Sequence, residues 1–160
     1  MLEVGFASLA WREAPMPGAP SIEMALLPKL PDGGFRAFVR FPPGWSRPDA
    51  GHYAVPEEFL VLDGTLSLNG ETWRRGSHAW VPAFRLRREL GSASGSLVFA
   101  WFGGTPRWIP GEPPPTPETA PAQRSWIEHG RFIRLMAPDA PRETLHLDDL
   151  TWRYETLRSA

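Results

Sequence analysis

Residues 51–64 read GHYAVPEEFLVLDG, and this stretch decides the fold that we expect. The run from Glu58 to Leu62 is apolar on both faces of an extended chain, which is typical of a strand covered on both sides. Asp63 and Gly64 follow, and both residue types tolerate the positive φ of a turn. The stretch therefore predicts a loop that carries His52, then a buried strand, then a tight turn.

Short strand-like segments recur on either side of this stretch. The segment Phe35–Phe41 alternates, and no long stretch keeps the spacing of an amphipathic helix. The 15 glycines and 19 prolines separate apolar segments, as in short strands joined by tight turns. These patterns predict an all-β fold. The other strands that we expect span Ile22–Leu27, Thr65–Leu68, His78–Val81, Phe84–Leu90, Ser96–Phe102, Trp126–Ile127, Arg131–Met136, Thr144–Leu147 and Trp152–Leu157.

Length and composition exclude several classes of function. A chain of 160 residues is long enough to bury a real core without disulfides. The formal net charge of −1 favours neither nucleic acid nor an anionic membrane as a partner. There is no cysteine, which removes thiolate metal sites and a cysteine nucleophile. We read no signal peptide and no membrane span, and we expect a cytoplasmic protein.

One segment differs in composition from the rest. Residues 105–122 are rich in proline, which lacks an amide donor and fixes φ, so we expect an extended connector there. We predict a single domain over residues 1–160, with a core of about 20–104, this connector, and a strand-rich extension over 123–160. The apolar load on both faces of Glu58–Leu62 predicts burial by another sheet, and we expect a homodimer.

Common catalytic motifs are missing from the sequence. It contains no phosphate-binding GxxxxGK[ST], no GxGxxG after a strand and no HExxH. No nucleophile stands beside a convincing base.

Three motifs carry a resemblance to a known family. They are PPGW at 42–45, EEFLVLDGTL at 57–66 and RRGSHAWVPA at 74–83, and in this order the region resembles the cupins. The likeness extends to small cupins with a glutamate pair before the strand, such as the cupin domain of the ChrR anti-sigma factors. The resemblance implies a double-stranded β-helix, a jelly-roll barrel whose mouth holds the site. An N-terminal strand and the C-terminal extension would be added to this barrel.

The resemblance also implies a metal motif, which this sequence fills only in part. The family offers two histidines one residue apart, then a glutamate, and later a third histidine. Glu57 matches the glutamate and His52 the second histidine, whereas Ala50 and Arg87 stand at the other two positions. We therefore expect no metal cofactor. If a metal binds nevertheless, the family implies Fe, Mn, Ni or Zn, held by His52 and Glu57.

An arginine at a ligand position changes the expected chemistry. A guanidinium keeps its charge and is no metal ligand, so we hypothesise that Arg87 pairs with Glu57 where relatives hold the cation. The pocket would then bind a polar or anionic small molecule. The residues that we expect to line it are His52, Tyr53, Glu57 and Arg87, with Arg40 as a possible addition.

Two other functions stay open, and with them the question of whether the protein is an enzyme. One is an oxygenase or isomerase, either with a metal shell completed by other residues or without metal and with His52 as the catalytic base. The other is a sensor or interaction module, as the ChrR likeness implies.

Overall fold

The computed structural model describes residues 1–31, 33–115, 124–135 and 141–156. The chain divides into two compact units, one over Ala10–Thr119 and one over Met1–Leu9 with Ala120–Ala160. The predicted all-β class is confirmed, because the described residues form strands and only one short 3-10 helix, Phe6–Ser8. None of the described helices is long and apolar enough to cross a membrane.

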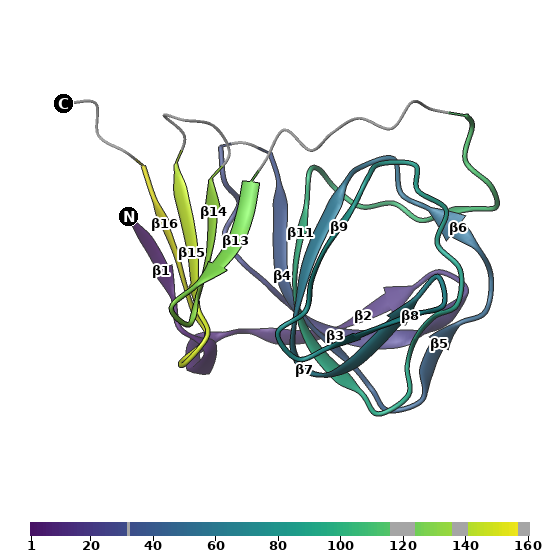
Figure 1. Cartoon of the computed structure of the whole chain (residues 1–160), viewed down its shortest axis with the longest axis horizontal. Coiled ribbons are helices and arrows are strands. Elements are labelled where there is room, and N and C mark those ends of the chain that lie inside the picture. The colour runs from purple at the N-terminus through teal and green to yellow at the C-terminus, as the bar shows by residue number, and fades with distance from the viewer. Residues whose placement is uncertain (32, 116–123, 136–140, 157–160) are drawn as a thin grey trace. The chain divides into compact units, whose positions relative to one another are not determined.

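The larger unit is a sheet of nine strands that curls into a barrel (Figure 1). Its strands follow the order β2-β3-β4-β11-β7-β10-β5, with β8 and β9 both paired to β7. A separate two-stranded ladder joins β12 to β6. The strands of this unit are β2 Trp11–Met16, β3 Ala19–Leu26, β4 Phe35–Phe41, β5 Trp45–Arg47, β6 Gly51–His52, β7 Glu57–Leu68, β8 Glu71–Arg74, β9 His78–Val81, β10 Leu90–Ser92, β11 Ser96–Phe102 and β12 Ile109–Pro110.

Strand β7 bends and serves both halves of the barrel. Its first residues pair with β9 and its last residues with β8, while β11 lies along the first half. The turn predicted at Asp63-Gly64 is wrong, because the strand continues through both residues. Gly64 has φ +71°, and a Cβ there would collide with the carbonyl oxygen of Gly95. Glycine thus permits a sharp bend inside one strand, beside a register shift in the ladder to β11.

The strand predicted over Phe84–Leu90 is also wrong. Phe84 and Glu89 have positive φ, at 62° and 53°, which breaks an extended chain. Within this irregular segment Arg87 forms one isolated bridge to Gly51, with hydrogen bonds of 2.8 and 3.2 Å in the two directions. Regular pairing resumes only in β10. The bridge nevertheless fixes the backbone of Arg87 against the loop that carries His52.

The alternation of β4 and β11 places apolar side chains inside the barrel. Ala37 and Val39 from β4 pack with Ala100 and Phe102 from β11 in one buried cluster. A second cluster gathers side chains of β7, β8, β9 and β11, among them Phe59 and Val61. Because strand side chains alternate, Arg36, Phe38 and Arg40 point to the opposite face of β4 from Ala37 and Val39.

The smaller unit is one antiparallel sheet of five strands (Figure 1). The strand order is β1-β16-β15-β14-β13, so the N-terminal strand pairs with the last strand of the chain. The extension predicted after the proline-rich segment is thus strand-rich, as expected. Met136 and Leu157, at the ends of two predicted strands, lie outside the described residues. The bounds are β1 Leu2–Val4, β13 Arg124–Glu128, β14 Arg131–Leu135, β15 Arg142–His146 and β16 Thr151–Glu155.

Candidate ligand-binding site

The barrel contains a cavity of about 450 Å³ that is partly open to solvent. This volume lies in the range of roughly 300–1,000 Å³ that is usual for sites that bind small molecules. Three lining side chains are charged, namely Glu57, Arg87 and Arg107, and most of the others are apolar. The apolar and aromatic lining includes Met16, Ile22, Met24, Phe35, Val39, Phe41, Tyr53, Phe59, Leu66, Leu68, Leu90, Val98, Phe102 and Trp108.

A buried ion pair forms the polar part of the cavity wall. Arg87 donates a hydrogen bond from Nη1 to Oε2 of Glu57, so the predicted ion pair is confirmed. Glu57 begins β7, and Arg87 is held by its bridge to Gly51. The side chains are only 4% and 11% exposed for Arg87 and Glu57 respectively. The charges are therefore shielded from bulk water, where each would otherwise be hydrated.

The guanidinium of Arg87 has hydrogen-bonding capacity left over. Its Nε and Nη2 are buried and find no hydrogen-bond partner among the described residues. The ring of Tyr53 lies 4.7 Å from the guanidinium carbon and offers its π face to the charge. A buried donor without an acceptor is costly, so an oxygen that reached this edge would be bound strongly.

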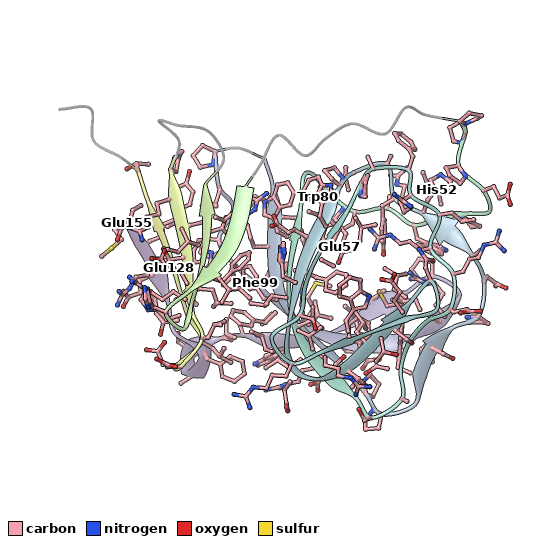
Figure 2. All side chains as sticks on the ribbon, in the orientation of Figure 1. His52, Glu57, Trp80, Phe99, Glu128 and Glu155 are labelled. Atoms are coloured by element: carbon pink, nitrogen blue, oxygen red, sulfur yellow. The ribbon has the colours of Figure 1, made fainter. Side chains whose placement is uncertain are left out.

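His52 does not line the cavity, contrary to the prediction. It is buried at 3% exposure, and its Nδ1 lies 3.0 Å from the carbonyl oxygen of Gly111. A carbonyl only accepts, so Nδ1 carries the hydrogen and donates it. In Figure 2 His52 lies beside β6, whereas Glu57 lies at the start of β7. His52 therefore fastens the segment after β11 to the barrel, and nothing brings it to the polar end of the cavity.

Arg40 also lies outside the cavity. Its guanidinium carbon stands 3.8 Å from the ring centroid of Trp11, and Nη1 is 3.6 Å from Oε2 of Glu23. The reason is the parity of β4, which turns Val39 inward and Arg40 outward. Of the five predicted ligand-binding residues, the structure brings together Tyr53, Glu57 and Arg87.

Glu58, the residue after Glu57 in β7, is also buried and also has a charged or titratable partner. Its side chain is 4% exposed, and Oε1 lies 2.7 Å from Nε2 of His78 on the neighbouring strand β9. The two adjacent glutamates of β7 thus serve opposite faces of the sheet, Glu57 the cavity and Glu58 the outside.

The residues present do not suit the transition metal that the cupin resemblance implies. Glu57 is engaged by Arg87, and the guanidinium charge would repel a cation at the same place. His52 is directed to Gly111 and does not line the cavity. Within residues 1–31, 33–115, 124–135 and 141–156, no group of three or more histidine and carboxylate side chains is placed to hold a metal ion.

Four cavity residues were missed because they lie in the segment interpreted as a connector. Arg107 and Trp108 line the cavity together with Thr105 and Pro106. Trp108 packs against the backbone of Gly51, where a Cβ would collide with the indole. The signal was the apolar pair Trp108-Ile109 inside a proline-rich stretch, since a solvated connector has no use for two such residues.

Comparison with known proteins rests on structure alone. No family model matches the sequence, and no curated protein matches it. The fold is similar to that of the polyketide cyclase RemF from Streptomyces resistomycificus, with a TM-score of 0.54 and 19% identity over 72% of this chain and 82% of that one. It is similar to an RmlC-like cupin protein from Ralstonia eutropha JMP134, with a TM-score of 0.54 and 14% identity over 65% and 69% of the two chains.

A third neighbour is an acetylacetone dioxygenase from Acinetobacter johnsonii, with a TM-score of 0.51 and 18% identity over 62% of this chain and 78% of that one. At sequence identities this low, the structural similarity shows the fold and not the function. The predicted jelly-roll barrel is confirmed, and the chain has the cupin fold.

Proposed function

We propose that the barrel binds a small, largely apolar molecule that carries one anionic or hydrogen-bond-accepting group, and that it does so without a metal. The observation that carries this proposal is Arg87, a lining residue of a mostly apolar cavity, whose Nε and Nη2 have no acceptor among the described residues. The apolar lining narrows the sequence-based expectation of a polar ligand to an amphipathic one.

The geometry of the guanidinium group supports a carboxylate at this edge. The group is planar, and Nε and Nη2 present their hydrogens in parallel along one side. A carboxylate can accept both at once, which adds orientation as well as binding energy. Glu57 meanwhile holds Nη1, so the remaining fork stays in a fixed direction.

The charge of the cavity lining supports an anion as well. Arg87 and Arg107 contribute two positive charges and Glu57 one negative charge, which leaves an excess of one positive charge. A singly charged anion would balance the lining. Arg107 is exposed, so it would attract the anion from solvent, whereas Arg87 is buried and would hold it.

The proposal is tested by calorimetry with two probes of nearly equal shape, 1-naphthoate and 1-naphthamide. We expect the carboxylate to bind at least about tenfold more tightly, because a hydrogen bond to a charged group contributes roughly 1.5–3 kcal/mol. The double variant Glu57→Leu/Arg87→Met should lose this preference and still bind the amide. Arg75→Gln, an exposed change elsewhere on the barrel, is the control.

Two outcomes would overturn the proposal. One is equal affinity of the wild-type protein for both probes, and the other is binding that a chelator abolishes. Elemental analysis of protein purified without chelators adds a direct check, since one equivalent of bound transition metal would favour a metal-dependent cupin enzyme instead.

The alternative of a metal-free isomerase has weaker support. A catalytic base must reach its substrate within hydrogen-bond distance, and His52 does not line the cavity. The proposed homodimer, the ChrR-like sensor role and the cytoplasmic location remain predictions. Sedimentation velocity at several concentrations tests the dimer.

A further inference from the structure

The segment 105–111, which we call the strap, closes one side of the cavity. It follows β11 and contributes Thr105, Pro106, Arg107 and Trp108 to the cavity lining. Beyond Trp108 it is tied to the barrel by the short ladder of β12 with β6. The strap therefore combines a wall of the cavity with an anchor on the rim.

Two polar contacts and one short ladder anchor the end of the strap. The amide of Gly111 donates to the carbonyl oxygen of Ala50 at 3.0 Å, and His52 donates from Nδ1 to the carbonyl oxygen of Gly111. Ile109 and Pro110 lie opposite His52 and Gly51 in the β12–β6 ladder. Because a two-residue ladder is marginal by itself, the strap depends on what holds Trp108.

Trp108 is held by an unusual neighbour, the guanidinium of Arg47. The guanidinium carbon of Arg47 lies 3.9 Å from the ring centroid of Trp108. Trp108 also contacts the ring of Tyr53 edge to face, with ring centroids 5.4 Å apart. Trp108 thus contacts both a cation and an aromatic ring that itself borders Arg87.

Arg47 is buried at a high electrostatic cost. It is 1% exposed, and none of its three guanidinium nitrogens finds a hydrogen-bond partner among the described residues. The π face of Trp108 compensates only part of this cost, because a cation–π contact is weaker than the hydration that a guanidinium loses on burial. Moving Trp108 away from Arg47 would uncover that face of the guanidinium, so the cost of burying this charge opposes the closed position of the strap.

We propose that Trp108 is the gate of the cavity and that Arg47 is the residue that positions it and keeps it easy to open. This inference rests on the proposed function for its purpose, since the strap forms part of the wall of the cavity in which the ligand would lie. The gate itself is a property of the chain and can be tested without any ligand.

The first test is amide hydrogen exchange of the peptide that covers residues 105–111. We expect exchange to slow by about tenfold in Arg47→Met, because an apolar side chain of similar length removes the cost of burying a charge. Arg47→Lys should exchange faster than wild type, since an ammonium is more strongly hydrated and lacks a planar face for the indole. Arg75→Met is the matched control and should leave exchange unchanged.

We thus expect exchange to be slowest in Arg47→Met, intermediate in wild type and fastest in Arg47→Lys. This order distinguishes a positioning role of Arg47 from simple packing. If Arg47 only filled space, both substitutions would loosen the strap and exchange would rise in each. Gly51→Ala provides an opposite perturbation, because its Cβ would collide with the indole of Trp108 and push the strap outward. Faster exchange is expected in this variant, with a far-UV spectrum that confirms a folded barrel. Unchanged or faster exchange in Arg47→Met would overturn the inference.

The second test follows binding of 8-anilino-1-naphthalenesulfonate, an apolar anion, by stopped-flow fluorescence. In Arg47→Met we expect association and dissociation both to slow by several-fold, with a smaller change in Kd, because a gate affects rates more than the bound state. If wild type binds neither this probe nor 1-naphthoate, the proposed function fails while the exchange result still stands. If the probe binds but its rates do not differ between wild type, Arg47→Met and Gly51→Ala, the gate fails alone.

Discussion

Each of the two units contains a buried arginine–glutamate pair, and the pairs differ in their surroundings. In the five-stranded sheet Arg134 and Glu143 face each other across β14 and β15, 0% and 1% exposed, with Nη1 and Oε2 3.7 Å apart. Trp152 donates from Nε1 to Oε1 of the same glutamate at 2.9 Å. The barrel pair, Arg87 and Glu57, borders a cavity instead.

The difference shows that a buried ion pair by itself does not indicate a binding site. Arg134 and Glu143 link two strands, and Glu143 also accepts a hydrogen bond from Trp152. Their charges therefore have a structural role in the sheet. Arg87 lines a cavity of about 450 Å³, and two of its guanidinium nitrogens have no acceptor among the described residues. The cavity, not the pairing, makes the second pair a candidate for function.

The largest expected effect comes from breaking the pair in the sheet. Arg134→Ala removes one charged partner of the buried Glu143, and we expect the free energy of unfolding to fall by about 3–5 kcal/mol. The affinity for 1-naphthoate should not change in protein that remains folded. Urea unfolding followed by circular dichroism measures the first quantity and calorimetry the second. A loss below about 1 kcal/mol would mean that the pair is not structural.

Replacing both charges in the barrel should have a smaller effect on stability. In Glu57→Leu/Arg87→Met no charge is left buried alone, so the free energy of unfolding should stay unchanged or rise by about 1–4 kcal/mol. The single variant Arg87→Ala is the reference, and it should lose stability because Glu57 stays behind. A double variant less stable than the single one would show that the pair holds the barrel together.

The indole donor in the sheet can be removed separately. Trp152→Phe keeps an aromatic ring but leaves Oε1 of Glu143 without this hydrogen bond, which should lower the free energy of unfolding by roughly 1–3 kcal/mol. Among the described residues the barrel pair has no equivalent indole donor, and Tyr53 presents its ring face to Arg87. Thermal melts compared with wild type check the loss. An unchanged melting temperature would contradict this role for the indole.

A surface charge at the cavity should matter little for stability and modestly for binding. Arg107→Gln removes one exposed positive charge from the lining, and we expect the affinity for 1-naphthoate to fall by roughly two- to fivefold at low salt. The loss should fade as ionic strength rises, because exposed charges are screened. Affinity for 1-naphthamide is the control and should stay the same.

The smallest expected effect concerns acid and the five-stranded sheet. The backbone amide of Thr151 donates to Asp149 and holds the pKa of that carboxyl below its usual 3.8. The folded pKa is lowered, so the stabilisation is present above pH 3.8 and is lost as the pH falls through the lowered pKa. Asp149→Asn should flatten this acid dependence slightly, whereas the barrel variants should keep it. Unfolding measured between neutral and acidic pH checks the difference.

Much of the barrel could be predicted from the sequence because its strands are strongly patterned. The bounds of β4, β9 and β11 agree with the expected segments, since alternation and apolar runs mark them clearly. Segment 84–90 was not predictable in this way, because its positive φ values at Phe84 and Glu89 depend on tertiary contacts. The pattern of apolar and charged residues in this segment is typical of a strand, but no strand forms over residues 84–89.

The site residues that follow from motif spacing were predicted correctly, whereas residues whose place depends on the tertiary fold were missed or misplaced. The positions of Glu57 and Arg87 followed from the motif, although Arg87 reaches the cavity from an isolated bridge and not from a strand. Arg40 was wrongly assigned to the cavity. Neighbouring residues of a strand point to opposite faces, and Val39 points inward, so Arg40 points outward. The burial of Arg47 could have been inferred from the sequence, since Trp45 and Arg47 are two residues apart and share one face of a short strand. The structure shows that both are buried.

One strand pairing in the barrel places the strap next to the charged pair, so that access to the cavity and its chemical preference depend on different residues. Phe102, the last residue of β11, lies opposite Glu57, the first residue of β7, and the amide of Gly103 donates to the carbonyl oxygen of Pro56 at 3.0 Å. The strap therefore leaves the barrel at the same edge where the charged pair sits. An engineer could exchange residues 105–108 of the strap to admit larger or smaller molecules and keep every strand as it is. Chemical preference and access would then be adjustable in turn, from one end of the barrel.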